Sequence, residues 1–416
     1  MAKNENDYDV IVVGGGPAGA SVAIRLAQSG ARVAVVEQKR FPREKLCGEF
    51  ISPECLAEFA RLGVLDAMRG AGGVGLRETV FYAVGGRAVA VPSEWFARGA
   101  GETCALGLSR AEMDARLLAR AREVGATVYE EAHAAGVLAR GARVGGVRAQ
   151  ARGGELTLRA PLTVDATGRE RFLAPRVGGR SGRRGLVAFK AHLEGARVAE
   201  GACEIYFYRG GYGGLSGVER GRANLCFIVA ARDVRARGSD AERVMREIVM
   251  TNRRAAETLK SARAATPWLA VALEGFGKFS VAPAPGLLAV GDAASFIDPF
   301  TGSGMLMALE SGALAAEVIA RHLPLLRSSE PVAREAAARG ADADGADSRG
   351  ALDALAAEYR ELYRGRFASR LRVCSYLRRA AFAPAAAVEL GVAALGVSAT
   401  LRRTLARATR GGGSVA

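Results

Sequence analysis

The sequence predicts an α/β protein, in which a Rossmann-type domain is combined with a second domain built on a β-sheet and with carboxyl-terminal helices. Three observations predict this fold class. A glycine-rich turn at 14–19 lies between an apolar, β-rich run and a stretch with helical spacing, and a second strand–turn–helix pattern occupies 286–323. Between them, the runs GLVAFKAHL, CEIYFYRG and ANLCFIVAA are short, rich in apolar, β-branched and aromatic residues, and separated by glycine-containing turns.

The first glycine-rich turn has the features of a phosphate-binding site. Gly14 permits the tight turn, Gly16 lets the backbone approach a pyrophosphate, and Gly19 lets the helix pack on the strand. The free N–H groups at the helix start and the positive end of its dipole attract phosphate. Glu37 ends the next strand, where its carboxylate can accept hydrogen bonds from an adenosine ribose. The predicted dinucleotide contacts are Gly14, Gly16, Pro17, Ala18, Gly19, Glu37 and Gln38.

Two alternatives stay open at this motif. The turn could belong to an ordinary βαβ unit, and these residues alone do not distinguish FAD from NAD. The second motif bears on that choice. It ends a predicted strand at Gly291 and Asp292, where a carboxylate beside a glycine-rich turn is well placed to bind a ribityl chain. The alternative is that Asp292 only caps the following helix. That helix, predicted to begin near Gly304, would favour an anionic reduced flavin through its dipole.

Five segments in the same order resemble the superfamily of FAD-dependent oxidoreductases that contains the class A flavin monooxygenases, or aromatic-ring hydroxylases, and the geranylgeranyl reductases. They are VVGGGPAGASVA with Glu37, FPREKLCGEFISP at 41–53, LSRAEMDARLLARAREVGATV at 108–128, VDATGRE at 164–170 and GDAASFIDPFTGSGMLMALESG at 291–312. The resemblance implies a bound FAD in a glutathione-reductase-like Rossmann-type domain.

The resemblance also implies individual roles. Arg110 is expected near the pyrophosphate and Asp292 at the ribitol, while Asp165 and Gly168 match a turn that packs beside the FAD. The residues implied to line the isoalloxazine are Pro299, Thr301, Gly302 and Gly304, and the other implied contacts are Lys45, Cys47, Gly48, Gly291 and Met305.

In that family the FAD-binding domain is discontinuous, and the sequence allows the same division. The FAD-binding domain is expected at 1–78, 105–175 and 280–325, and the substrate domain at 79–104 and 176–279. Residues 326–350 are rich in Ala, Gly, Asp and Ser and predict a linker or insertion, followed by a helical region at 351–416.

Two residues are candidates for catalysis besides Pro299 and Gly304 at the flavin. Cys47, in the segment that looks most like the geranylgeranyl reductases, could act as a nucleophile or proton donor; the alternative is a small buried residue. Tyr212 lies in a glycine-rich segment that could face the substrate or simply be a hairpin turn. Lys190 and His192 should share one face of a strand, where we expect them to be solvated.

The leading hypothesis is an FAD-dependent monooxygenase that hydroxylates or epoxidises a hydrophobic small molecule through a flavin C4a-hydroperoxide. The rival, which the K-x-C-G pattern favours, is a geranylgeranyl-reductase-like enzyme that reduces alkene double bonds. A third hypothesis is a non-catalytic electron-carrying flavoprotein, against which the large substrate half argues. The substrate would be aromatic, polyketide or isoprenoid. Because only one complete phosphate-binding fingerprint is present, NAD(P)H would bind transiently as electron donor, or a separate flavin reductase would supply electrons.

Composition limits the other partners. The net charge of +15 comes largely from Arg spread through an Ala- and Gly-rich sequence, so we predict no nucleic-acid partner. The three His and six Cys are far apart, so no metal site is predicted. The start has no basic region followed by an apolar one, and a cytoplasmic location is expected.

The carboxyl-terminal region raises a membrane question. From 380 to 401 only Glu389 is charged, and arginines bracket the stretch. Since Pro384 interrupts it, a spanning helix is not expected. The helices should either pack on the body as a hairpin or form a surface that receives a lipophilic substrate or makes a peripheral membrane contact.

Overall fold

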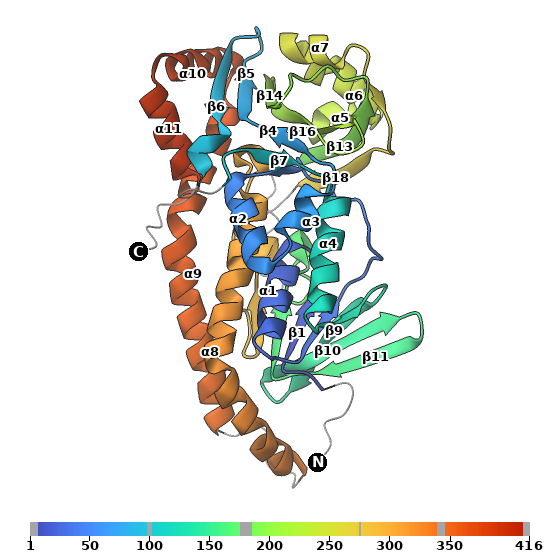
Figure 1. The fold of residues 1–416 in the computed structure, drawn as a ribbon, viewed down its shortest axis with the longest axis vertical. Coiled ribbons are helices and arrows are strands. Elements are labelled where there is room, and N and C mark those ends of the chain that lie inside the picture. Colours follow the sequence, from blue (N-terminus) through green and yellow to red (C-terminus); the bar gives the residue numbers. More distant parts are fainter. Residues whose placement is uncertain (1–6, 98–101, 175–184, 274–275, 339–345, 411–416) are drawn as a thin grey trace.

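The computed structural model describes residues 7–97, 102–174, 185–273, 276–338 and 346–410. Figure 1 shows an elongated molecule with a parallel-sheet domain in its lower half, a second sheet with its own helices above it, and two long helices along one side. The predicted α/β fold class is confirmed.

The parallel sheet forms the centre of the first domain, in the strand order β20-β12-β1-β2-β8. All its strands are short, and all but the edge strand β8 are fully buried, as expected for a parallel sheet that is covered on both faces. They are β1 (Val10–Val13), β2 (Val33–Val36), β8 (Thr127–Tyr129), β12 (Leu162–Asp165) and β20 (Leu287–Ala289).

The two faces of this sheet are covered by different layers. Val10 and Val12 pack against α1 (Pro17–Gln28), α4 (Arg110–Glu123) and α8 (Gly304–Ala338) in the largest core cluster. Ile11 and Val13 point the other way, because side chains alternate along a strand. There they pack on an antiparallel sheet of β9 (His133–Arg140), β10 (Arg143–Ala151) and β11 (Gly154–Arg159).

The second domain is a mixed sheet in the order β17-β13-β16-β15-β14-β5-β6, with β18 also paired to β13. Its strands are β5 (Glu78–Tyr82), β6 (Ala88–Pro92), β13 (Leu186–Glu194), β14 (Ala202–Tyr208), β15 (Gly211–Gly217), β16 (Ala223–Ala230), β17 (Arg263–Ala264) and β18 (Leu269–Leu273). The three predicted strands are confirmed as β13, β14 and β16. The hairpin-turn alternative for the segment around Tyr212 is wrong, since 211–217 is a central strand.

Three helices cover the outer face of this second sheet. They are α5 (Ala231–Arg235), α6 (Ala241–Glu247) and α7 (Arg253–Leu259), which bury one core cluster against it. Two small sheets are also present, β3 (Phe50–Ile51) with β7 (Ala105–Gly107) and β4 (Val74–Leu76), and β19 (Gly277–Lys278) with β21 (Ser295–Phe296). The helices α2 (Pro53–Leu62) and α3 (Leu65–Arg69) pack in the core of the parallel-sheet domain. The inner face of the second sheet is turned toward the parallel-sheet domain.

The chain from residue 326 onward is more helical than the sequence suggested. The segment 326–350, predicted as a linker, is helical wherever it is described: α8 continues to Ala338 and α9 (Ala346–Ala381) begins before 350, with 339–345 outside the described residues. Alanine, glutamate and arginine favour helix even where apolar residues are few. Two shorter helices follow, α10 (Ala385–Val397) and α11 (Ala399–Ala408).

These last helices bear on the membrane question. Within the described ranges, no helix on its own combines the length and apolar character that crossing a bilayer requires. Taken together, α10 and α11 meet the length and composition criteria, but the chain bends by 111° between them.

Candidate cofactor and substrate site

A large cavity of about 760 Å³ lies between the parallel sheet and the inner face of the second sheet. It runs from the first glycine-rich turn, past Asp292, to the carboxyl-terminal helices. The structure places all the predicted site residues on its wall except Gly19 and Asp165.

The first turn is shaped by its glycines in three different ways. At Gly14 the backbone has φ +108°, and a Cβ there would lie 2.3 Å from the Ala166 oxygen. A Cβ on Gly19 would lie 1.9 Å from the Gly14 oxygen, so this glycine serves packing rather than binding. At Gly16 a Cβ would meet nothing nearer than 3.9 Å, because that position opens into the cavity. It precedes α1 without capping it through a side chain, which leaves N–H groups available to an anion.

Two arginines face this opening. The guanidinium groups of Arg110 and Arg43 each lie 3.9 Å from the Cβ position of Gly16. Asp114 holds both: it accepts two bonds from Arg110, at 2.9 and 2.7 Å, and pairs with Arg43 at 3.0 Å. Burial lowers the pKa of Arg110, but the Asp114 carboxylate more than offsets this and raises it above its ordinary value. Open N–H groups beside two fixed cations fit a pyrophosphate. Arg43 was not among the residues predicted from the sequence, although it lies in the segment 41–53 that carries the family resemblance.

The Glu37 carboxylate is fixed by hydrogen bonds at the same end of the cavity. Its carboxylate accepts hydrogen bonds from the backbone nitrogens of Gly15, at 2.7 Å, and Lys39, at 2.9 Å. The side chain is buried yet lines the cavity beside Gln38. This fixed orientation suits a carboxylate that accepts hydrogen bonds from a ribose.

Asp292 lies in the middle of the cavity wall, half-buried. The alternative role as a helix cap is wrong, because α8 begins only at Gly304. Burial raises the pKa of Asp292, while Arg110, Arg169 and Lys45 oppose that rise. A polyol that donates hydrogen bonds to the carboxylate would stabilise its ionised form. The residues present therefore fit the ribityl–pyrophosphate part of FAD.

Asp165 has a different role from the one implied by resemblance. It lies at the end of β12, away from the cavity wall, and its carboxylate accepts bonds from the Thr167 nitrogen at 3.0 Å and hydroxyl at 2.6 Å. These bonds shape the turn whose Ala166 oxygen packs on Gly14. Gly168, with φ +76°, follows in the same turn and does line the cavity.

The loop at 298–304 forms the wall on the far side of Asp292. Asp298 fixes it by accepting hydrogen bonds from the Tyr212 hydroxyl and, at 3.0 Å, from the Phe300 nitrogen. Arg378 of α9 pairs with the same carboxylate at 3.1 Å. Burial raises the pKa of both Tyr212 and Asp298. The loop, the second sheet and α9 are thus tied together beside the cavity.

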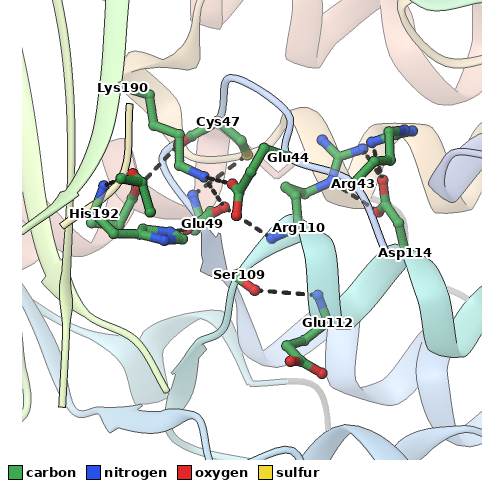
Figure 2. Close-up of polar contacts among 12 residues, drawn as sticks. Arg43, Glu44, Cys47, Glu49, Ser109, Arg110, Glu112, Asp114, Lys190 and His192 are labelled. Carbon is green, nitrogen blue, oxygen red and sulfur yellow. Dashed lines mark hydrogen bonds and ion pairs between the residues drawn. The ribbon is translucent and has the colours of Figure 1, made fainter. Parts of the chain in front are cut away.

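An ionic cluster lies next to Cys47 (Figure 2) and consists of Glu44, Glu49, Lys190 and His192. Glu49 Oε1 accepts from Lys190 Nζ at 2.7 Å, and its other oxygen lies 2.7 Å from His192 Nε2. Glu44 also accepts from Lys190. The expectation that Lys190 and His192 are solvated is wrong, because both side chains are at most 4% exposed. They share a strand face as predicted, but the domain interface covers it.

Beyond the loop the cavity becomes apolar. Phe300 packs with Phe81, Phe207 and Tyr212, with ring centroids 5.2 to 5.8 Å apart. The wall then continues over small and aliphatic residues of the last helices: Ala380, Ala381, Ala387, Val388, Gly391, Val392 and Leu395. All seven fall in the stretch 380–401, for which a surface that receives a lipophilic substrate was one alternative, but no motif marks them individually.

Comparisons with known proteins agree with this geometry. A family model described as an FAD binding domain matches residues 7–324. A digeranylgeranylglycerophospholipid reductase of Methanopyrus kandleri is 30% identical over 332 residues, 76% of this chain and 77% of that protein. A menaquinone reductase of Mycolicibacterium smegmatis is 29% identical over 325 residues, 75% and 76% of the two chains. The flavin-dependent brominase Bmp2 has a similar fold, with a TM-score of 0.74 at 20% identity over 98% of this chain and 94% of that one.

Proposed function

We propose that this chain, which belongs to the FAD binding domain family and is an FAD-dependent oxidoreductase, reduces carbon–carbon double bonds in a long isoprenoid substrate. One observation carries the choice of substrate. The cavity continues as an apolar passage from the 298–304 loop to α10, which suits a chain of many carbons better than a compact molecule. The names of the two curated relatives, both reductases of isoprenoid-bearing compounds, support it.

When bound, FAD would supply the two electrons of the reduction. The protein's part would begin with binding: Glu37 for the ribose, the start of α1 with Arg43 and Arg110 for the pyrophosphate, and Asp292 for the ribityl hydroxyls. The apolar walls exclude water from the reacting bond.

Saturating a double bond also needs a proton at the second carbon. Cys47 Sγ and Tyr212 Oη are the proposed protic groups, because both residues line the cavity. Tyr212 donates its hydroxyl hydrogen to Asp298, so it is already engaged. Cys47 accepts a hydrogen bond from the Glu49 nitrogen at 3.4 Å, and among the described residues none is found to accept from its S–H, so we assign the proton to it.

The electron donor remains part of the proposal. NAD(P)H is proposed to bind transiently at the open side of the cavity, because the chain has one complete phosphate-binding fingerprint and FAD takes it. A separate flavin reductase is the alternative donor. Reduction of the bound flavin by NADH, by NADPH or only by added reductase would separate the three cases.

A monooxygenase acting on a flat hydrophobic molecule is the second candidate. The ring cluster of Phe81, Phe207, Phe300 and Tyr212 favours it, because such rings can stack on an aromatic substrate. This proposal ranks below the reductase, since the apolar passage continues well beyond the rings.

Product analysis tests the two candidates. The protein with FAD would be reduced without oxygen and mixed with geranylgeranyl and menaquinone-type substrates, with parallel reactions under ¹⁸O₂. A product two mass units heavier, formed anaerobically, supports the reductase. Incorporation of ¹⁸O, with no product in the absence of oxygen, would replace it with the monooxygenase, and electron transfer to an acceptor without product would leave only an electron carrier.

The substrate would reach the cavity from a lipid surface. Leu390 and Val397 of α10 are 72% and 90% exposed, and Leu401 of α11 is 45% exposed, next to the apolar end of the cavity. Two exposed arginines lie nearby, Arg379 before α10 and Arg403 within α11, so an anionic bilayer is the partner that this surface fits. We propose a peripheral contact there.

A further inference from the structure

We propose that Glu49 is a positioning residue: it locks the Cys47 loop, residues 44–49, against the second sheet and the first turn of α4, so that the Cys47 thiol keeps one orientation in the cavity. The inference deepens the proposed function, in which Cys47 supplies the proton. Its geometry does not depend on that reaction.

The Glu49 carboxylate joins three parts of the fold (Figure 2). One oxygen accepts from Lys190 Nζ at 2.7 Å and from the Arg110 backbone nitrogen at 2.9 Å, and the other oxygen lies 2.7 Å from His192 Nε2. Lys190 and His192 belong to β13 of the second sheet, while Arg110 begins α4 and faces the phosphate opening. A single side chain therefore connects the loop to both walls of the cavity.

The backbone of Glu49 acts directly on the thiol. Its N–H donates to Cys47 Sγ at 3.4 Å, and its carbonyl accepts from the Leu108 nitrogen at 3.3 Å. Its φ is +53°, a left-handed conformation that non-glycine residues rarely adopt and that surrounding bonds must maintain. Asn224 of β16 holds the other side of the loop, donating to the Cys47 carbonyl at 3.1 Å.

The charges explain why a glutamate is needed at this position. Glu49 is fully buried and Lys190 is 1% exposed, so the ammonium has the two carboxylates of Glu49 and Glu44 as partners. Burial would lower the pKa of Lys190, but these carboxylates raise it, so Lys190 stays a cation. Glu44, Glu49 and His192 are close enough to hold a metal ion, but the Lys190 ammonium already supplies the positive charge there.

Thiol accessibility gives a test that needs neither substrate nor turnover. All six cysteines lie in described parts of the chain, and only Cys47 and Cys104 are not buried. In a Cys104→Ser background, with FAD bound, the rate of Cys47 alkylation by iodoacetamide would be compared for Glu49, Glu49→Gln and Glu49→Ala. Glu204→Gln is the matched control, because Glu204 is a fully buried carboxylate of the second sheet, paired with Arg254 at 2.7 Å and absent from the cavity wall.

We expect Glu49→Ala to change the alkylation rate at least fivefold. The rate of Glu49→Gln should stay closer to that of the parent, because an amide can still accept hydrogen bonds from Lys190 and Arg110. The rate of Glu204→Gln should stay within twofold of the parent. Lys190→Met should act in the direction of Glu49→Ala. Equal rates in all variants well below their melting temperatures, or a change with Glu204→Gln as large as with Glu49→Ala, would overturn the proposal. Suppression of alkylation by Zn²⁺ in the parent alone would replace positioning with metal binding.

The same variants separate this inference from the proposed reaction. If the protein reduces no alkene but the thiol rates differ as expected, the proposed function fails and the positioning role stands. Where the reductase activity is found, Glu49→Ala should lower kcat severalfold more than it changes KM, because the thiol orientation affects the reacting bond rather than the apolar chain, and Glu49→Gln should stay closer to the parent.

Discussion

The two ends of the cavity are closed by opposite kinds of chemistry. At the amino-terminal end, three polar groups are fixed by named partners: Glu37 by Gly15, and Arg110 and Arg43 by Asp114. At the carboxyl-terminal end, the wall that α10 forms is aliphatic and includes Val392. Directional bonds suit one cofactor of constant structure. A small-residue apolar wall suits a chain whose length and conformation vary, because dispersion contacts require no particular partner geometry.

The largest expected effect lies at the fixed end. Gly16→Val places its side chain in open space, so the apoprotein should fold normally while the branched side chain fills the phosphate opening. We expect FAD affinity to fall more than a hundredfold, measured by flavin absorbance after gel filtration. Gly19→Val is the contrasting variant, because its Cβ would lie 1.9 Å from the Gly14 oxygen and should prevent folding. Yellow Gly16→Val protein would contradict the assignment of this opening to FAD.

Asp292→Asn should weaken FAD binding about ten- to a hundredfold, since charged hydrogen bonds contribute about 1.5–3 kcal/mol. Without FAD, the same substitution should stabilise the protein. Burial raises the pKa of Asp292 above 3.8, so the carboxyl contributes stability when protonated and loses it as the pH rises through the folded-state pKa. The variant should therefore melt higher than the parent at pH 7, with a gap that closes toward pH 4. A difference in melting temperature that stays constant from pH 7 to pH 4 would contradict a raised pKa of Asp292 in the folded protein.

How much was predictable from the sequence follows the same division. Glycines at 14, 16 and 19 act through local backbone geometry, so their spacing in the sequence predicts the phosphate-binding turn. Glu49 and its partners Lys190 and His192 are separated by 141 and 143 residues, and no local pattern marks such a contact. For a related reason the sequence offered a substrate-receiving surface at 380–401 only as one alternative: α10 has helical alanines and valines that look alike whether they line a cavity or face solvent.

The apolar end should control which substrate lengths are accepted. Val392→Trp places an indole at the passage wall, where Val392 is 5% exposed. We expect kcat/KM for a geranylgeranyl substrate to fall about tenfold while that for a single-isoprene analogue stays within twofold. Leu362→Trp on α9 is the control, since Leu362 is 38% exposed and not part of the cavity wall. Equal losses on both substrates would indicate misfolding or a different substrate path.

The smallest expected effect concerns the exposed face of α10. Replacing Leu390 and Val397 together by glutamate should leave the melting temperature nearly unchanged, because both side chains are largely exposed, but should weaken sedimentation with anionic vesicles about fivefold or more. Inserting such side chains into a bilayer contributes about 1.5–3 kcal/mol each when burial is complete, and less at an interface. Leu325→Glu, on α8 and 58% exposed, is the control. Raising the salt concentration should weaken the parent's binding as well, because flanking arginines contribute by charge. Vesicle binding that is unaffected by the α10 substitutions would move the lipid contact elsewhere and separate substrate entry from the apolar end of the cavity.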